Sequence, residues 1–229
     1  MKKLVFAIAL GAALLALPGS SLAGVPGGTL RAHLETTLFS LYAGEYDPDV
    51  GGNTDFNQLS FGLGAPNDHQ MNVLIPTGQV LLGFGGAVID NLLVGGRVAM
   101  FFARHEDDYP GGGGDVTYKA FHWGVIPYAE YLFLDGPVRP FVTAELGFHG
   151  VVGETEYCGG GSCRDDDYHG WFFRIGAGGG AHFFLAESFS LDATMLLGYS
   201  HGGGEWDDDD DWKIDLFRMD LLLGISGWI

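Results

Sequence analysis

The chain ends in the stretch 216-LFRMDLLLGISGWI-229, in which large apolar residues share one parity. That parity holds Phe217, Met219, Leu221, Leu223, Ile225 and Ile229. The opposite parity includes Arg218 and Asp220. Successive side chains of a strand point to opposite faces, so this period of two predicts a β-strand with one apolar and one mixed polar face.

The same alternation recurs upstream and predicts about eight antiparallel strands, over residues 30–38, 80–88, 92–102, 121–133, 138–149, 171–185, 189–200 and 216–229. Tight turns are expected at 90–91, 135–137 and 186–187. The other connections are long, at about 43–74, 106–116, 153–168 and 202–211. Short turns at one end and long loops at the other are typical of outer-membrane β-barrels. Residues 56–64 also alternate weakly, so ten strands are the alternative.

The polar faces of these strands carry arginine and carboxylate in equal number, among many glycines and without lysine. The basic residues are Arg31, Arg97, Arg139, Arg174 and Arg218, and the acidic ones are Glu35, Glu130, Glu145, Asp192 and Asp220. This composition indicates a narrow lumen closed by ion pairs. Eight large apolar faces would overfill the inside of a small barrel, so we expect them to face hydrocarbon.

The N-terminus has the features of a signal peptide. Lys2 and Lys3 precede an apolar run over residues 4–17, and Ser21-Leu22-Ala23 fits a cleavage site. We therefore expect residues 1–23 to be a signal peptide and residues 24–229 to form one transmembrane all-β domain. No later segment has about 18 uncharged apolar residues, so we expect no membrane helix.

This organisation resembles the OmpA/OmpX-type small outer-membrane β-barrels over about residues 28–229. The resemblance rests on the strand count, the loop asymmetry, the charged lumen, the segment Ile126-Pro-Tyr-Ala-Glu-Tyr131 and the final strand. It implies an integral protein of the bacterial outer membrane, inserted by the barrel assembly machinery, that contacts outer-membrane lipids and lipopolysaccharide. We expect a monomer. Ile229 stands where such barrels usually end in Phe.

The chain's net charge of −18 argues against a nucleic-acid partner, because phosphate binding needs clustered Lys and Arg. The two cysteines, Cys158 and Cys163, are close in sequence and predict one local disulfide in an oxidising compartment.

Two groups of loop residues are candidate ligand sites. Five consecutive carboxylates, Asp207, Asp208, Asp209, Asp210 and Asp211, could attract a divalent cation such as Ca²⁺ or Mg²⁺. The alternative is a hydrated, repulsive surface. Arg104, Lys119 and Lys213 have lipid-facing parity near the long-loop ends and could bind lipid phosphates, with ordinary snorkelling as the alternative. No other cofactor is expected.

The sequence favours a structural or surface-interaction barrel over two alternatives. The first alternative is a narrow cation-preferring pore, suggested by the acidic loops. The second is a lipid A-modifying enzyme, for which Ser200 and His201 are the candidate pair. Adjacent strand residues point to opposite faces, so this pair is poorly placed for catalysis and we expect no enzyme.

Overall fold

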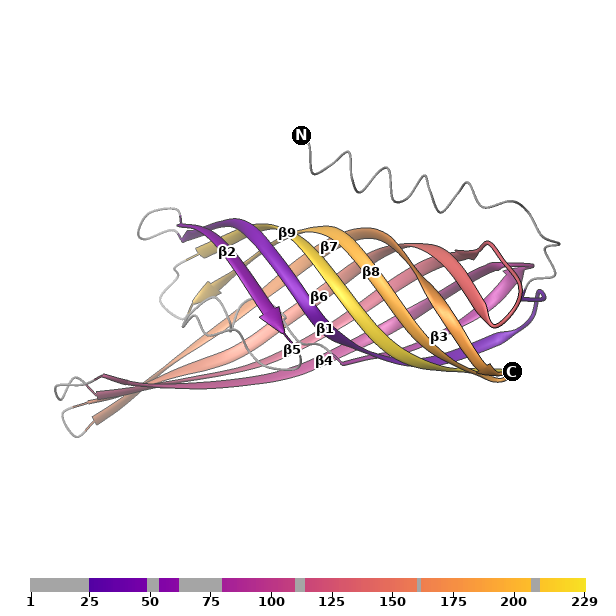
Figure 1. The fold of residues 1–229 in the computed structure, drawn as a ribbon. Coiled ribbons are helices and arrows are strands. Elements are labelled where there is room, and N and C mark those ends of the chain that lie inside the picture. The colour runs from indigo at the N-terminus through magenta and orange to yellow at the C-terminus, as the bar shows by residue number, and fades with distance from the viewer. Residues whose placement is uncertain (1–24, 49–53, 62–79, 110–113, 160–161, 207–210) are drawn as a thin grey trace.

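A computed structural model describes residues 25–48, 54–61, 80–109, 114–159, 162–206 and 211–229, and the expected signal peptide lies outside them. They form β1 (Leu30–Pro48), β2 (Thr54–Phe61), β3 (Val80–Ile89), β4 (Leu92–Tyr109), β5 (Gly114–Leu132), β6 (Val138–Gly159), β7 (Ser162–Ala186), β8 (Phe189–Trp206) and β9 (Asp211–Trp228). Neighbouring strands are antiparallel, and pairing of β1 with β9 closes the sheet into a barrel (Figure 1). Within these ranges, no helix has the length and apolarity needed to cross a membrane.

The nine strands occupy eight positions around the barrel. Residues Leu30–Thr36 of β1 pair with β3, whereas Phe39–Tyr46 of the same strand pair with β2. Thus β2 and β3 follow one another along the same side of β1 and share one position in the ring. The prediction of eight strands is confirmed. The alternative of ten strands is wrong, because β2 shares a position with β3 and does not widen the ring.

The barrel has its apolar side chains outside and its charged side chains inside. Phe102 is 76% exposed and Phe148 56%, whereas Arg97 is 0% and Glu130 0% exposed. An outward apolar band surrounds the wall on every strand of the ring, which is the arrangement expected for a wall in contact with lipid. The predicted orientation of the two faces is therefore confirmed.

A bulge in β1 explains why the first strand alternates weakly in the sequence. The register between β1 and β9 shifts between Thr37 and Phe39, so one extra residue is inserted there. Before the bulge, odd-numbered residues such as Glu35 and Thr37 point into the lumen. After the bulge, even-numbered residues such as Ser40 and Tyr42 point into the lumen. The inward parity changes, and both halves of the strand keep a polar inner face.

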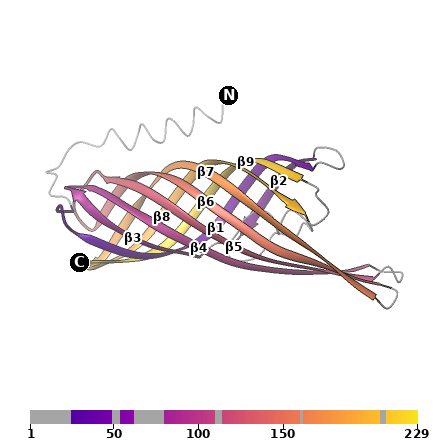
Figure 2. The ribbon, with the colours of Figure 1, turned by 180° about the vertical axis from the view of Figure 1, so that it is seen from behind.

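Several strands continue well past the expected loop boundaries. The expected loop at 106–116 is mostly strand, because β4 runs to Tyr109 and β5 starts at Gly114. The expected loop at 153–168 is mostly strand too, because β6 runs to Gly159 and β7 starts at Ser162. The two hairpins extend beyond the rest of the wall as an arm made of residues 104–109, 114–120, 153–159 and 162–167 (Figures 1 and 2). Inward Val116 and Tyr118 alternate with outward Thr117 and Lys119, so the strand period continues through this acidic, glycine-rich region.

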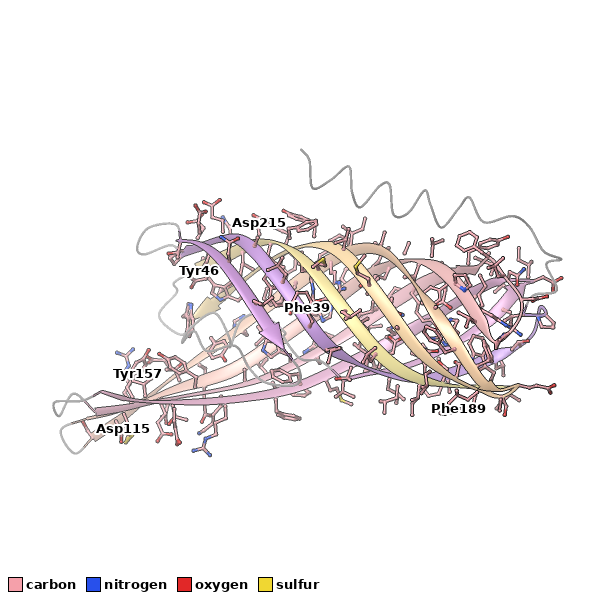
Figure 3. The ribbon with its side chains drawn as sticks, viewed as in Figure 1. Phe39, Tyr46, Asp115, Tyr157, Phe189 and Asp215 are labelled. Atoms are coloured by element: carbon pink, nitrogen blue, oxygen red, sulfur yellow. A yellow bond between two sulfur atoms is a disulfide. The ribbon has the colours of Figure 1, made fainter. Side chains whose placement is uncertain are left out.

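The barrel has two distinct ends. We call the end with the arm and Asp215 the outer end, and the opposite end of the axis, with the tight turns and Phe189, the inner end (Figure 3).

Candidate functional site

The lumen near the inner end is organised around Arg31 of β1. Its Nη1 lies 3.0 Å from Glu130 Oε1 of β5, and its Nη2 lies 3.2 Å from Asp192 Oδ2 of β8. Its Nε donates to Ser226 Oγ at 2.9 Å. The guanidinium thus spans the lumen and joins strands that are not neighbours, with all its polar contacts shielded from solvent.

His182 of β7 occupies the same level and is held between two carboxylates. Nδ1 lies 2.7 Å from Asp192 Oδ1, and Nε2 lies 2.8 Å from Glu130 Oε1. Ionised carboxylates only accept hydrogen bonds, so an imidazolium, which donates from both ring nitrogens, fits this position. The ring also stacks on Phe141, with centroids 4.5 Å apart.

The middle of the lumen is bridged by Arg97 of β4. Its Nε lies 2.8 Å from Glu35 Oε2 of β1, and its Nη1 lies 3.1 Å from Glu145 Oε2 of β6. The guanidinium also lies 4.3 Å from the centroid of the Tyr128 ring, which adds a cation–π contact.

Two arginines complete the network towards the outer end. Arg174 Nη2 lies 2.7 Å from Glu145 Oε1 and 3.1 Å from Asp220 Oδ2. Arg218 Nε lies 2.7 Å from the same Asp220 Oδ2, and Ser40 Oγ donates to Asp220 Oδ1 at 2.6 Å. The charged groups therefore follow one another along the barrel axis.

Nine of the ten residues predicted for this network belong to it, and Arg139 does not. Its Nε donates to the Gly136 carbonyl at 3.3 Å, and its guanidinium lies over the Phe184 ring at 4.4 Å. Arg139 sits next to a tight turn, where parity alone does not place a long side chain inside the barrel. His182 takes the fifth basic position instead, so five basic side chains face five carboxylates.

Apolar clusters lie inside the barrel on both sides of the ions. The outer cluster comprises Tyr42, Val116, Tyr118, Ala120, Val151, Tyr168, Phe172, Trp212, Ile214 and Leu216. The inner cluster comprises Val25, Ala87, Leu93, Leu132, Phe141 and Trp228. Sequence alternation did not reveal the outer cluster, because eight of its ten members lie beyond the ends of the expected strands. Only Phe172 and Leu216 fall inside them.

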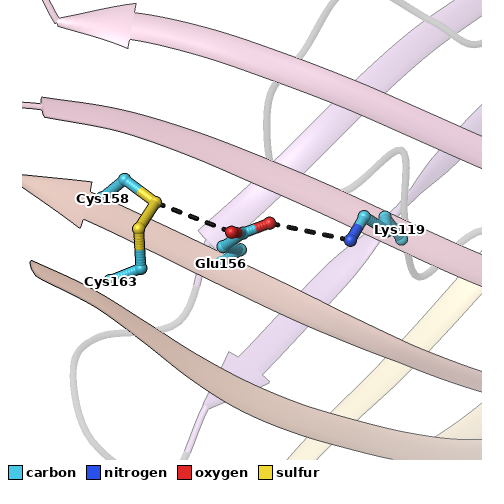
Figure 4. The surroundings of a disulfide bond; sticks show 4 residues. All are labelled: Lys119, Glu156, Cys158 and Cys163. Atoms are coloured by element: carbon cyan, nitrogen blue, oxygen red, sulfur yellow. Dashed lines mark hydrogen bonds and ion pairs between the residues drawn. A yellow bond between two sulfur atoms is a disulfide. The ribbon is translucent and has the colours of Figure 1, made fainter.

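The predicted disulfide between Cys158 and Cys163 is confirmed, and it joins β6 to β7 at the tip of the arm (Figure 4). Glu156 lies between the disulfide and Lys119 on the outward face of the arm. Lys119 also contacts Glu154. These two carboxylates raise the pKa of the Lys119 ammonium group, with the hydrogen bond to Glu154 as the main cause.

The remaining candidate residues are scattered. Asp211 begins β9 and is exposed, whereas Asp207, Asp208, Asp209 and Asp210 lie outside the described residues. Arg104 and Lys119 are opposite each other on β4 and β5, and Lys213 lies away from them on β9. Ser200 is buried inside the barrel, but His201 points outward and contacts Asp215 at 2.8 Å, so the pair lies on opposite faces.

A family model described as "Protein of unknown function (DUF3575)" matches residues 107–206. No curated protein sequence matches the chain.

Solved barrels resemble the chain over most of its length. The outer membrane protein OprG from Pseudomonas aeruginosa matches with a TM-score of 0.50 and 9% identity, covering 91% of this chain and 99% of that one. Neisserial surface protein A matches at a TM-score of 0.40 and 14% identity, covering 87% and 98%. Ail of Yersinia pestis matches at 0.39 and 13%, covering 89% and 99%. With its closed antiparallel ring and inside-out faces, the chain has the fold of the small outer-membrane β-barrels.

Proposed function

We propose that this protein is a closed barrel of the bacterial outer membrane with a structural or surface-interaction role. The observation that carries the proposal is the filling of the lumen along its length. From the outer end inward, the described residues provide an aromatic cluster, a balanced set of ion pairs and a second apolar cluster. A ring of eight strands has room for little more than these side chains.

This filling argues against the alternative of a narrow cation-preferring pore. A conducting pore needs a continuous column of water, yet Tyr42 and Trp212 at the outer level are 0% and 1% exposed. Arg31 and Asp192 at the inner level are 2% and 3% exposed. Opening a path would separate buried charges from their partners, which costs about 3–5 kcal/mol for each broken pair.

Conductance across a planar bilayer tests the closed lumen. The folded full chain should give no steady current. Folding of each sample is checked on gels, where a folded barrel migrates differently before and after heating. A Trp212→Ala, Tyr42→Ala double variant, which empties part of the outer cluster, serves as the comparison and should also stay closed, because the ion pairs remain. Steady cation-selective current through the wild-type protein would overturn the proposal in favour of the pore.

The arm is the part of the molecule best suited to contacts outside the cell. The described side chains of its strands include seven carboxylates and three basic groups, the latter being Arg104, Lys119 and Arg164. The acidic side chains are Glu106, Asp115, Glu154, Glu156, Asp165, Asp166 and Asp167. Such a surface favours cationic partners, among them Ca²⁺ or Mg²⁺.

Equilibrium dialysis with Ca²⁺ tests this part of the proposal. Replacing Asp165, Asp166 and Asp167 by Asn should lower the number of ions bound per chain, whereas replacing Asp90 at the inner end by Asn should not. Equal binding by all three proteins would show that the arm does not attract the cation.

Arg104, Lys119 and Lys213 are the basic side chains proposed to bind lipopolysaccharide phosphate. Arg104 contacts Glu106 at 2.7 Å and Lys119 contacts Glu154, so carboxylates compete with phosphate for both cations. Changing all three basic residues to Gln and measuring co-purified lipopolysaccharide tests the idea. Unchanged retention would exclude a role for these residues.

We propose no catalytic role. The opposite orientations of Ser200 and His201 support this view, because a nucleophile and its base must be within hydrogen-bond reach. Overexpression should leave the mass of lipid A unchanged, and a shifted mass would favour the enzyme alternative.

A further inference from the structure

The outer wall of the barrel is hollowed along one diagonal line. One hollow of ≈ 680 Å³ lies over β5–β9, and a second of ≈ 460 Å³ lies over β1, β2, β8 and β9. Tyr199 and Phe217 line both hollows, so the two hollows adjoin at this pair of side chains, and we call them together the groove.

The lower part of the groove is apolar and arises from small side chains. Ala129, Ala144 and Ala177 are paired in register on β5, β6 and β7, and all three point outward. Leu146 and Ile175, in the adjacent row, form one wall. Three alanines side by side in a band of large apolar residues leave a depression in the lipid-facing surface.

The upper part of the groove ends at three carboxylates. Asp55 of β2 pairs in register with Glu45 of β1, which pairs with Asp215 of β9. Tyr199 donates a hydrogen bond to Asp215, and this contact, followed by that from His201, lowers the pKa of the Asp215 carboxyl. Asp215 lies one row beyond Phe217, outside the apolar band, and carries a negative charge at neutral pH.

The groove has the dimensions of a lipid chain lying against the wall. Strands are about 4.8 Å apart, so the five steps from β5 to β1 cover about 24 Å. Strands of such barrels are tilted by about 35–45°, so a line perpendicular to them rises through the membrane. The groove therefore begins among apolar residues at hydrocarbon depth and reaches the head-group level at Glu45, Asp55 and Asp215.

We propose that this groove binds a lipid whose head group carries an ammonium ion. The acyl chain lies over Ala129, Ala144 and Ala177, and the ammonium group lies between the carboxylates of Glu45, Asp55 and Asp215. Glu45, Asp55 and Asp215 are aligned on paired strands, so an ammonium ion placed there is attracted by all three carboxylates. An anionic head group would meet the same three carboxylates and be repelled.

Two lipids with the same chain and different head groups test the proposal. The folded full chain in a neutral detergent is titrated with myristoyl lysophosphatidylethanolamine or with myristoyl lysophosphatidylglycerol, and bound lipid is counted by native mass spectrometry. Wild type should bind the ammonium lipid more tightly by about tenfold, the value of one charge-assisted hydrogen bond. Equal affinities, or tighter binding of the glycerol lipid in Mg²⁺, would overturn the proposal.

Variants assign the effect to the two parts of the groove. Glu45→Gln with Asp55→Asn should remove the preference for the ammonium lipid, whereas Asp165→Asn with Asp167→Asn makes the same charge change on the arm and should keep it. Ala144→Leu should weaken binding of both lipids, with Ala177→Leu as a second filling variant if the first fails to fold. Ala32→Leu, on the lipid-facing wall outside the groove, should bind as wild type does. An unchanged preference in the Glu45 and Asp55 variant would contradict the proposed head-group site.

Discussion

Arg31 and Glu130 are 99 positions apart in the chain, yet the guanidinium Nη1 of one lies 3.0 Å from the carboxylate Oε1 of the other across the lumen. Both side chains are fully shielded from solvent. Their contact cannot form within a hairpin, because β1 and β5 are not neighbours in the sheet. The pair therefore ties together two strands that share no backbone hydrogen bonds.

Arg31→Met should strongly destabilise the barrel, whereas Arg139→Met should have a small effect. Removing one partner of a buried pair costs about 3–5 kcal/mol, because Glu130 and Asp192 would remain charged without their guanidinium. Arg139 instead contacts the Phe184 ring and the Gly136 carbonyl near the surface, and an exposed cation–π contact contributes about 0.5–1 kcal/mol. Urea unfolding in lipid vesicles measures both variants. Equal losses would contradict the placement of Arg139 outside the network.

Gly178→Ala should destabilise the barrel, and Gly96→Ala should not. A Cβ added at Gly178 would lie 1.9 Å from the Met195 carbonyl oxygen and 2.9 Å from Leu196 Cα, so the backbone would have to move. Overpacking of this kind costs about 1–3 kcal/mol. At Gly96 the added Cβ meets nothing within 4 Å. The same unfolding assay compares the two, and an unaffected Gly178→Ala barrel would show that the lumen is less tightly packed than described.

Replacing Cys158 and Cys163 together by Ser should loosen the tip of the arm and leave the barrel unchanged. The disulfide joins β6 to β7 beyond the apolar band, so its loss acts on a local opening rather than on the ring. Limited proteolysis followed by mass spectrometry should show faster cleavage near these positions. The urea midpoint of the barrel serves as the control and should not shift.

Lys119 should react slowly with amine-directed reagents at alkaline pH. Its raised pKa keeps the ammonium form to higher pH, and only the neutral amine is nucleophilic. Glu154→Gln with Glu156→Gln removes the two carboxylates that raise the pKa, so this variant should be labelled faster at the same pH. The labelling rate of the Lys119 peptide is measured from pH 8 to pH 10 in both proteins. The same pH profile in both would contradict the ion pairing.

Side-chain parity allowed the sequence to predict the wall but not the contacts inside it. The alternation around Arg97 and Arg174 correctly predicts that these residues point inward, because a strand offers only two faces. It does not tell which carboxylate each guanidinium meets, since that depends on strand tilt and on how the ring closes. The pairing of Arg97 with both Glu35 and Glu145 therefore came only from the structure.

Other features were hidden by local composition. The glycine-rich, acidic stretch around Asp115 was expected to be a loop, yet it continues β5 because its inward positions pack against the outer cluster. The bulge between Thr37 and Phe39 changes the inward parity of β1, which weakened the pattern there. Arg139 has the inward parity and lies in β6, but it is beside a turn, and its long side chain contacts the Gly136 carbonyl instead of a lumen carboxylate.

The positions of the lumen partners have a consequence for insertion. Arg97 on β4 meets carboxylates on β1 and β6, and Arg31 on β1 meets carboxylates on β5 and β8. In a sheet that has not yet joined β1 to β9, Arg31 and Asp192 lie near opposite edges and cannot meet. Joining the edges brings these two charges together, so an unclosed intermediate is more polar in the bilayer than the finished cylinder.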